Sequence, residues 1–145
     1  MPAEPDAATP ARIVPERQEH NRAFWTGGAD DELLIARCTR CSLWVHPPSA
    51  DCPQCGGELV AQPVSGRGTV FTYTVNHHPF NPTVPPPYVI AIVALEEQSD
   101  LRLAANIVDC EMDSVHIGMP VQVRFERQDL EQDTVYVPVF APSAP

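Results

Sequence analysis

The chain has 145 residues, which suffices for one ordinary domain, or for one domain with a small attached module. It has 19 acidic and 9 basic residues, for a formal net charge of −10, and every basic residue is arginine. This charge argues against a nucleic-acid partner, because binding to phosphates relies on Lys and Arg, and no apolar run approaches the roughly 18 residues that cross a bilayer.

The N-terminal stretch MPAEPDAATPAR has neither the basic nor the apolar region of a secretory signal, so a cytoplasmic location is expected. In a reducing compartment, paired cysteines bind metal or carry out redox chemistry more often than they cross-link. Residues 1–15 are rich in Pro and Ala and offer little to bury, so they are predicted to form a disordered tail or linker.

The next segment, residues 16–32, is predicted to contain an N-terminal helix. ERQEHNRAFW consists largely of good helix formers, and the Gly pair at 27–28 provides a stop. Phe24 and Trp25 lie together near the end of this helix. They either pack the helix on its own domain or form a docking surface for a partner, since interfaces favour aromatic clusters.

Residues 33–63 contain four of the five cysteines, in two C-x-x-C pairs: Cys38, Cys41, Cys52 and Cys55. Each pair lets two thiolates reach one ion from a tight turn, and together they predict the tetrahedral four-thiolate site that zinc prefers. Because four thiolates leave no open position for water, the metal is expected to be structural. An iron site of the rubredoxin kind has the same ligands. A redox dithiol is disfavoured, since one pair would suffice and no βαβ pattern surrounds either pair.

The segment between the two pairs is long enough for a small hairpin carrying Trp44 and His46. Gly56 follows the second pair, where a positive φ turns the backbone amides toward the metal, and Ser42 stands at the equivalent place in the first. Cys110 has no partner in the sequence pattern and is interpreted as a small buried hydrophobe.

The remainder of the chain, residues 64–142, is predicted to be an OB-type barrel. Five stretches rich in β-branched and aromatic residues read as strands, at 69–77, 88–95, 101–108, 121–127 and 135–140. Turn sequences separate them, with a longer connection between the third and the fourth, as in a small Greek-key barrel. The predicted fold class is therefore mainly β, with an N-terminal helix, a small zinc ribbon and a five-stranded barrel.

Candidate reactive residues are His77, His78, Tyr73, Asp109 and His116. Neighbouring residues on a strand face opposite sides, so the two adjacent histidines cannot act on one substrate as a simple pair. The chain has no GxSxG motif, no phosphate-binding loop and no cysteine-protease sequence context. Alone, it is not expected to be an enzyme.

The order of the motifs resembles that of a known family. The chain has a helix ending in FW, followed by LLIARCTRC, HPPSADCPQCG, SGRGTVFTYTV, PPPYVIAIVAL, IGMPVQVRFE and PVFAP. From about Glu16 to Pro142 it is similar to the bacterial and archaeal family once called domain of unknown function thirty-five, a rubredoxin-like zinc ribbon followed by an acyl-CoA-associated OB-fold.

The resemblance implies a supporting role in acyl-CoA chemistry. Members act beside thiolase-superfamily enzymes, where the small subunit docks on the larger one and helps form its acyl-CoA channel. In actinobacterial steroid breakdown, a similar domain accompanies a thiolase-like aldolase, a lyase that cleaves a side-chain CoA ester by a retro-aldol reaction. We therefore expect a non-catalytic accessory subunit with one structural zinc, in a heterotetramer with such a partner.

Four residues are candidates for contact with the partner or with acyl-CoA at the shared interface: Phe24, Trp25, Trp44 and Arg67. Arg67 lies between two glycines and either contacts a CoA phosphate or an acidic partner, or caps a barrel corner. The stiff loop at 80–87 is either a partner or channel wall, or a rigid connection.

Three alternatives remain open. The first is an accessory subunit of an acetyl-CoA acyltransferase, and the second is a small acyl-CoA enzyme or carrier in its own right. The third is an autonomous OB-fold binder of single-stranded nucleic acid, in which Phe71 and Tyr73 would stack on bases.

Overall fold

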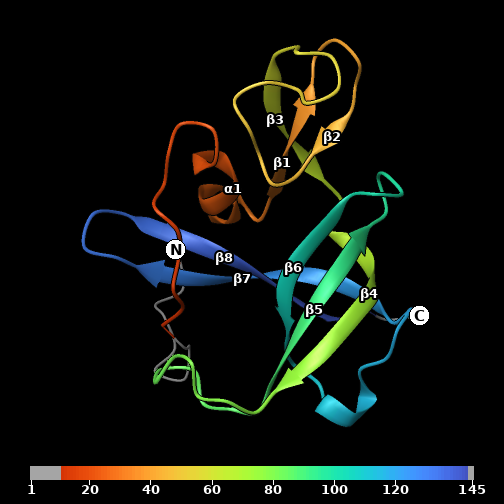
Figure 1. Ribbon diagram of the computed structural model, residues 1–145. Coiled ribbons are helices and arrows are strands. Elements are labelled where there is room, and N and C mark those ends of the chain that lie inside the picture. The colour runs from red at the N-terminus through yellow and green to blue at the C-terminus, as the bar shows by residue number, and fades with distance from the viewer. Residues whose placement is uncertain (1–10, 144–145) are drawn as a thin grey trace.

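The computed structural model describes residues 11–143 and has the mainly β architecture that the sequence predicts. The elements are α1 (Arg22–Thr26), the 3₁₀ turn η1 (Gly27–Asp30), β1 (Leu33–Cys38), β2 (Trp44–Val45), β3 (Leu59–Val64), β4 (Arg67–Asn76), β5 (Tyr88–Leu95), β6 (Arg102–Ile107), the 3₁₀ turn η2 (Met112–Ser114), β7 (Pro120–Asp129) and β8 (Thr134–Pro142). They form a three-stranded sheet in the order β2-β1-β3 and a closed barrel in the order β4-β5-β6-β8-β7 (Figure 1). No helix in residues 11–143 is long and apolar enough to span a bilayer.

The barrel follows the five predicted strands closely. Antiparallel pairing joins β4 to β5, β5 to β6 and β7 to β8, and β4 also pairs with β7. The barrel closes through a parallel contact between β6 and β8, where Ile107 lies opposite Phe140. The long connection predicted between the third and fourth strands is present and includes η2, and the chain then returns through β7 so that β8 runs parallel to β6. The OB-type topology is therefore confirmed.

Helix α1 is present but shorter than the sequence suggests, since it begins at Arg22. The side chain of Asn21 accepts a hydrogen bond from the Gln18 N–H (2.6 Å) and donates one to the carbonyl of Glu16 (3.2 Å). Such side-chain bonds offer the backbone an alternative to helical ones. The good helix formers before Asn21 consequently adopt a turn, and one short helical segment follows.

The first ten residues of the predicted tail lie outside the described part of the chain. Residues 11–15 have no regular secondary structure, but polar contacts hold them against the barrel. The carbonyl of Ala11 accepts hydrogen bonds from Asn81 Nδ2 (2.9 Å) and Thr83 Oγ1 (2.6 Å), and Arg12 pairs with Glu126. Charge pairing holds this segment in place, and its Pro- and Ala-rich composition gives no sign of it.

Ribbon and barrel share one hydrophobic core. Phe24 of α1, and Leu33 and Ile35 of β1, are buried in the same cluster as the barrel residues. Trp44 of β2 belongs to this cluster as well. In Figure 1 the small sheet sits at one end of the barrel, with α1 between it and the β7–β8 hairpin. The ribbon therefore has a fixed position on the barrel.

Candidate functional site: a metal centre and an apolar cavity

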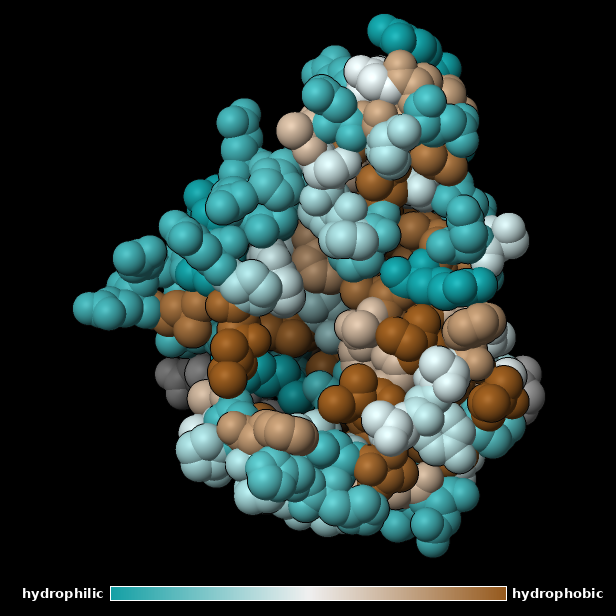
Figure 2. All heavy atoms as spheres, in the orientation of Figure 1, coloured by the Kyte–Doolittle hydropathy of each residue, from teal (hydrophilic) through white to brown (hydrophobic). Residues whose placement is uncertain are grey.

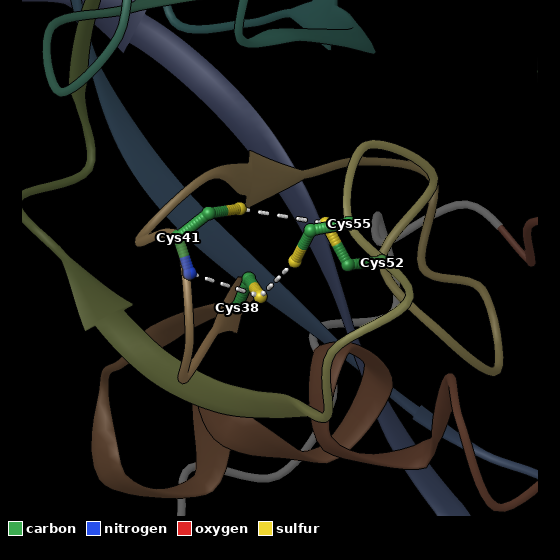
Figure 3. A group of neighbouring side chains, drawn as sticks. All are labelled: Cys38, Cys41, Cys52 and Cys55. Carbon is green, nitrogen blue, oxygen red and sulfur yellow. Dashed lines mark hydrogen bonds between the residues drawn. The ribbon is translucent and has the colours of Figure 1, made fainter.

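The four paired cysteines converge on one point in the ribbon (Figure 3). Their Sγ atoms all lie within 4.8 Å of one another, with Cys38 and Cys55 3.4 Å apart and Cys41 and Cys52 3.7 Å apart. Tetrahedral metal–sulfur bonds of about 2.3 Å place the sulfurs roughly 3.8 Å apart, whereas a disulfide holds them at about 2.05 Å. The arrangement is that of a structural metal site.

Both cysteine pairs adopt the same backbone turn. The Ser42 N–H donates to the carbonyl of Cys38 (3.0 Å), and the Gly56 N–H donates to that of Cys52 (2.9 Å). Ser42 and Gly56 have φ values of 64° and 74°, both in the left-handed region. Ser42 thus takes the conformation that a glycine would adopt more easily, without disturbing the ligands.

Electrostatics within the cluster favour a cation. The backbone N–H groups of Cys41 and Arg40 donate to Cys38 Sγ (3.4 Å each) and lower the pKa of this thiol to about 6, against the effect of burial. The N–H of Leu43 lowers the pKa of Cys41, but burial and the other sulfurs raise it to about 12. Four sulfurs this close cannot all ionise without a positive charge among them. The donor set fits a divalent metal and leaves it no open position for catalysis.

Gly57 provides a test of this geometry. A Cβ at this position would lie 2.9 Å from Cys38 Sγ and 3.2 Å from Cys55 Sγ. Gly57→Ala is therefore expected to weaken metal affinity by about tenfold or more, the usual effect of disturbing the support of metal ligands. Competition with a chromophoric chelator measures the change. Gly56→Asn is the control, because a Cβ there meets nothing within 4 Å and Asn tolerates a positive φ; equal affinities in the two variants would contradict the prediction.

Trp44 connects the metal-bearing ribbon to the barrel. The backbone N–H of Trp44 donates to Gln98 Oε1 (3.0 Å), and Gln98 Nε2 donates back to the backbone carbonyl of Trp44 (3.0 Å). Its indole is buried, and the Arg37 guanidinium lies 4.6 Å from the ring centroid. Of the four predicted contact residues, Trp44 and Phe24 are thus buried within the chain itself.

A cavity of about 660 Å³ lies where α1, the ribbon and the barrel meet. Most of its lining is apolar, and Trp25 forms part of the wall. It is lined by Arg12, Ile13, Pro15, His20, Asn21, Phe24, Trp25, His46, Pro47, Pro48, Phe80, Asn81, Val84, Tyr88, Ile90, Leu103, Ala104, Ala105, Asn106, Val137 and Pro138. The Pro-rich loop, one of whose proposed roles was a channel wall, contributes three of these residues.

His46, on the ribbon side of the cavity, makes stability depend on pH. Burial lowers its pKa to about 4, and its ring packs 4.9 Å from that of Phe24. Unfolded His titrates near 6.5, so the unfolded chain binds the proton more readily. The contribution of His46 to stability should be full above about pH 6.5 and be lost toward pH 4, and it amounts to roughly 3 kcal/mol. Urea unfolding across this range measures the loss. His46→Gln should flatten the slope and exposed His116→Gln should not; an unchanged slope in His46→Gln would refute the assignment.

The other candidate reactive residues do not converge. His77 and His78 are exposed after the end of β4, and His116 is exposed beside η2. Asp109 is an exposed turn residue with a φ of 60°. None of them lines the cavity. Arg67 is also exposed and pairs with Glu96 (2.9 Å) at the start of β4.

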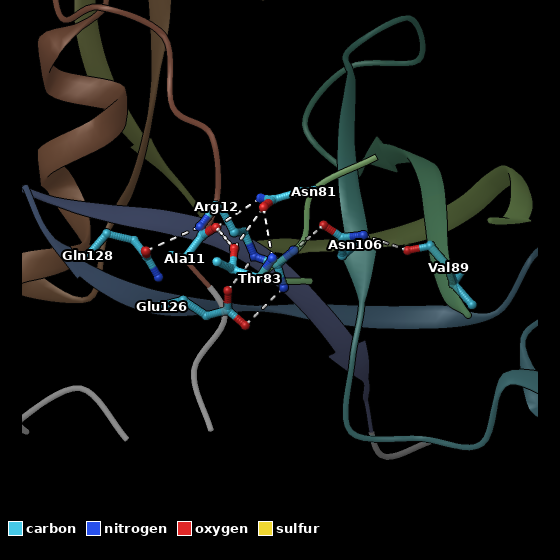
Figure 4. A network of polar contacts seen from close by, with 8 residues as sticks. All are labelled: Ala11, Arg12, Asn81, Thr83, Val89, Asn106, Glu126 and Gln128. Atoms are coloured by element: carbon cyan, nitrogen blue, oxygen red, sulfur yellow. Dashed lines mark hydrogen bonds and ion pairs between the residues drawn. The ribbon is translucent and has the colours of Figure 1, made fainter. Parts of the chain in front are cut away.

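Sequence reasoning missed a polar network that includes Arg12 and Asn106 of the cavity lining. Arg12 binds both carboxylate oxygens of Glu126 and donates to Asn106 Oδ1 (2.8 Å), as Figure 4 shows. Asn106 Nδ2 in turn donates to the carbonyl of Val89 (2.9 Å). Asn106 and Glu126 are 94 and 114 positions from Arg12 in the sequence and belong to no motif, so only the fold brings them together.

Comparison with known families adds two matches along the chain. Residues 25–60 match the profile described as ChsH2, rubredoxin-like zinc ribbon domain, and residues 61–126 match that of ChsH2, C-terminal OB-fold domain. A solved structure named Ltp2-ChsH2(DUF35) aldolase superposes with a TM-score of 0.75 at 37% identity, covering 90% of this chain and 100% of that one.

Three curated relatives are similar in sequence. A DUF35 domain-containing scaffold protein of Methanocaldococcus jannaschii is 39% identical over 66% of this chain and 68% of its own. A probable enoyl-CoA hydratase alpha subunit of Thermomonospora curvata is 39% identical over 86% of this chain. The 3-oxo-4,17-pregnadiene-20-carboxyl-CoA hydratase alpha subunit of Mycobacterium tuberculosis is 37% identical over 83% of it. The chain spans only 38% and 39%, respectively, of these two hydratase subunits.

Proposed function

Since the chain belongs to the DUF35 family, with a ChsH2-type zinc ribbon and OB-fold, we propose that it is a non-catalytic accessory subunit that docks on a larger enzyme of CoA-ester metabolism. The observation that carries this proposal is the similarity, over nearly the whole described chain, to a subunit of the Ltp2-ChsH2(DUF35) aldolase. The absence of convergent reactive side chains among residues 11–143 supports a non-catalytic role, since acid–base and nucleophilic catalysis need several groups in one place.

The partner in this proposal is a thiolase-superfamily enzyme, and the two chains form a heterotetramer. The reaction they support is retro-aldol cleavage of a steroid side-chain CoA ester. Two relatives support this finer assignment: the solved one is named as an aldolase, and the one from M. tuberculosis is named as a subunit of a pregnadiene carboxyl-CoA hydratase. Zinc is the proposed metal, held by Cys38, Cys41, Cys52 and Cys55, and its contribution is to stabilise the ribbon.

Reconstitution tests the proposal. The tagged chain is purified from its native host, the thiolase-superfamily protein that accompanies it is expressed alone, and the two are mixed. We expect retro-aldol cleavage of the steroid CoA ester by the mixture and by neither chain alone, with light scattering giving the mass of a heterotetramer.

A matched variant tests whether this chain is an accessory subunit or supplies a catalytic group itself. His77→Ala combined with His78→Ala removes two exposed imidazoles and should leave the activity of the mixture unchanged, because the chain supplies no catalytic group. Full activity of the partner alone, or turnover by this chain alone, would overturn the proposal. Hydratase or acyltransferase activity in place of cleavage would overturn the assignment of the reaction. Salt-dependent binding of oligonucleotides would favour the nucleic-acid alternative.

A further inference from the structure

The cavity has the dimensions of a ligand site. It lies outside the barrel over β5 and β6, between the segment 11–21, helix α1, the ribbon turn at 47–48 and the loop that begins at Phe80. Figure 2 shows a hollow on this face, with apolar side chains gathered around it and polar ones within it. Its volume of about 660 Å³ lies within the range of roughly 300–1,000 Å³ that is typical of small-molecule sites.

Large apolar side chains are left exposed around this cavity. Ile13 is 84% exposed, Phe80 71% and Ile90 39%, and all three line it. Single exposed apolar residues scattered over a surface are normal, but these three gather in one concavity of a chain whose net charge is −10. Such a cluster is a sign of a binding site.

The charges of the lining decide what the cavity can hold. Among the described lining residues there is no Asp or Glu and one Arg. That Arg12 is engaged by the carboxylate of Glu126 and the side-chain oxygen of Asn106, so it is not free for a ligand. Phosphates are held in proteins by charge-assisted hydrogen bonds from Arg or Lys, and an unpaired charge is costly to bury among apolar groups. The cavity suits an uncharged ligand.

The Arg12 contacts also shape the cavity. They tie the segment 11–15 to β7 through Glu126 and to β6 through Asn106 (Figure 4). Farther along, Arg17 forms a two-bond pair with Asp133, which lowers the pKa of that carboxyl. These pairs keep the N-terminal segment over the barrel, above the residues of β5 and β6 that line the cavity.

We infer that this cavity binds the uncharged apolar acyl portion of a CoA thioester, of about steroid size, while the phosphates of CoA stay outside it. This inference rests on the proposed function for the identity of the ligand. It divides the substrate between two chains: this one contacts the acyl portion, and the partner supplies the cations for the nucleotide end.

Calorimetric titration of the isolated full chain tests the assignment, with progesterone as a neutral steroid probe and free coenzyme A as the charged one. We expect saturable one-to-one binding of the steroid and none of coenzyme A. Ile90→Glu places a carboxylate beside the ligand and should weaken steroid binding by about tenfold or more, since the charge would be desolvated. Ile117→Glu is the matched control, because Ile117 is 67% exposed and lies outside the cavity.

The outcomes separate this inference from the proposed function. Absence of saturable steroid binding, binding of coenzyme A in place of the steroid, or unchanged binding by Ile90→Glu would overturn the cavity assignment, whatever the partner requires. Thermal unfolding of Ile90→Glu and Ile117→Glu checks that both remain folded. A partner that is fully active alone would overturn the accessory role, while steroid binding that is sensitive to Ile90→Glu would still support the cavity.

Discussion

Cys52→Ser is expected to release the metal and unfold the ribbon while the barrel remains folded. Cys52 is buried, and its sulfur lies 3.7 Å from that of Cys41, so its loss breaks the four-thiolate site. A module this small lacks enough apolar burial to fold alone, and structural zinc contributes about 10–16 kcal/mol of binding free energy in isolated zinc fingers. The barrel has its own closed sheet and should survive.

Metal analysis and hydrogen exchange together measure this effect. The native chain should contain about one zinc per chain, and iron in its place would identify the rubredoxin alternative. Amides of β1–β3 should lose protection in Cys52→Ser, while those of β4–β8 keep it. Cys110→Ser is the control, since Cys110 lies outside the cluster. A fully protected ribbon without metal would disprove a structural role for the site.

Phe140→Ala is expected to destabilise the barrel by about 3–5 kcal/mol, the usual range for removing a buried Phe. Phe140 is fully buried on β8, where it lies opposite Val123 of β7 and Ile107 of β6. Its carbonyl also accepts a hydrogen bond from the Val108 N–H (2.8 Å). The side chain therefore fills the core at the point where the barrel closes.

Urea unfolding compares this variant with Phe71→Ala. Phe71 is 46% exposed at the bulge of β4, outside the cavity, and the Arg102 guanidinium lies over its ring. Loss of its packing should change stability by less than about 0.5 kcal/mol, and loss of the cation–π contact should add about 0.5–1 kcal/mol. Similar losses in the two variants would mean that closure of the barrel does not depend on Phe140.

The metal and the cavity are connected through the shape of the ribbon. His46, Pro47 and Pro48 follow β2 and form one side of the cavity, while the Trp44–Gln98 hydrogen bonds hold β2 on the barrel. A metal without an open coordination position can thus affect ligand binding by keeping this wall in place. The steroid titration, repeated on Cys52→Ser, should show weaker binding for this reason.

Local patterns in the sequence determined much of the architecture. The spacing of the four cysteines identified the metal site, because a C-x-x-C turn brings two sulfurs together whatever surrounds it. The strands were equally accessible, since β-branched runs between turn sequences encode them residue by residue; β5 has the predicted bounds 88–95. Only the helix was overestimated, because the Asn21 side chain forms a turn where propensity favoured helix.

Tertiary structure alone decided which residues face which. Phe24 and Trp44, two of the candidates for contact with a partner or with acyl-CoA, are both buried where ribbon and barrel share a core, and Phe24 also lines the cavity. These positions depend on the docking of two modules. The cavity and its Arg12 network unite residues up to 114 positions apart. No local pattern encodes these contacts, because the Arg12 pair and the cavity form only when distant segments fold against one another.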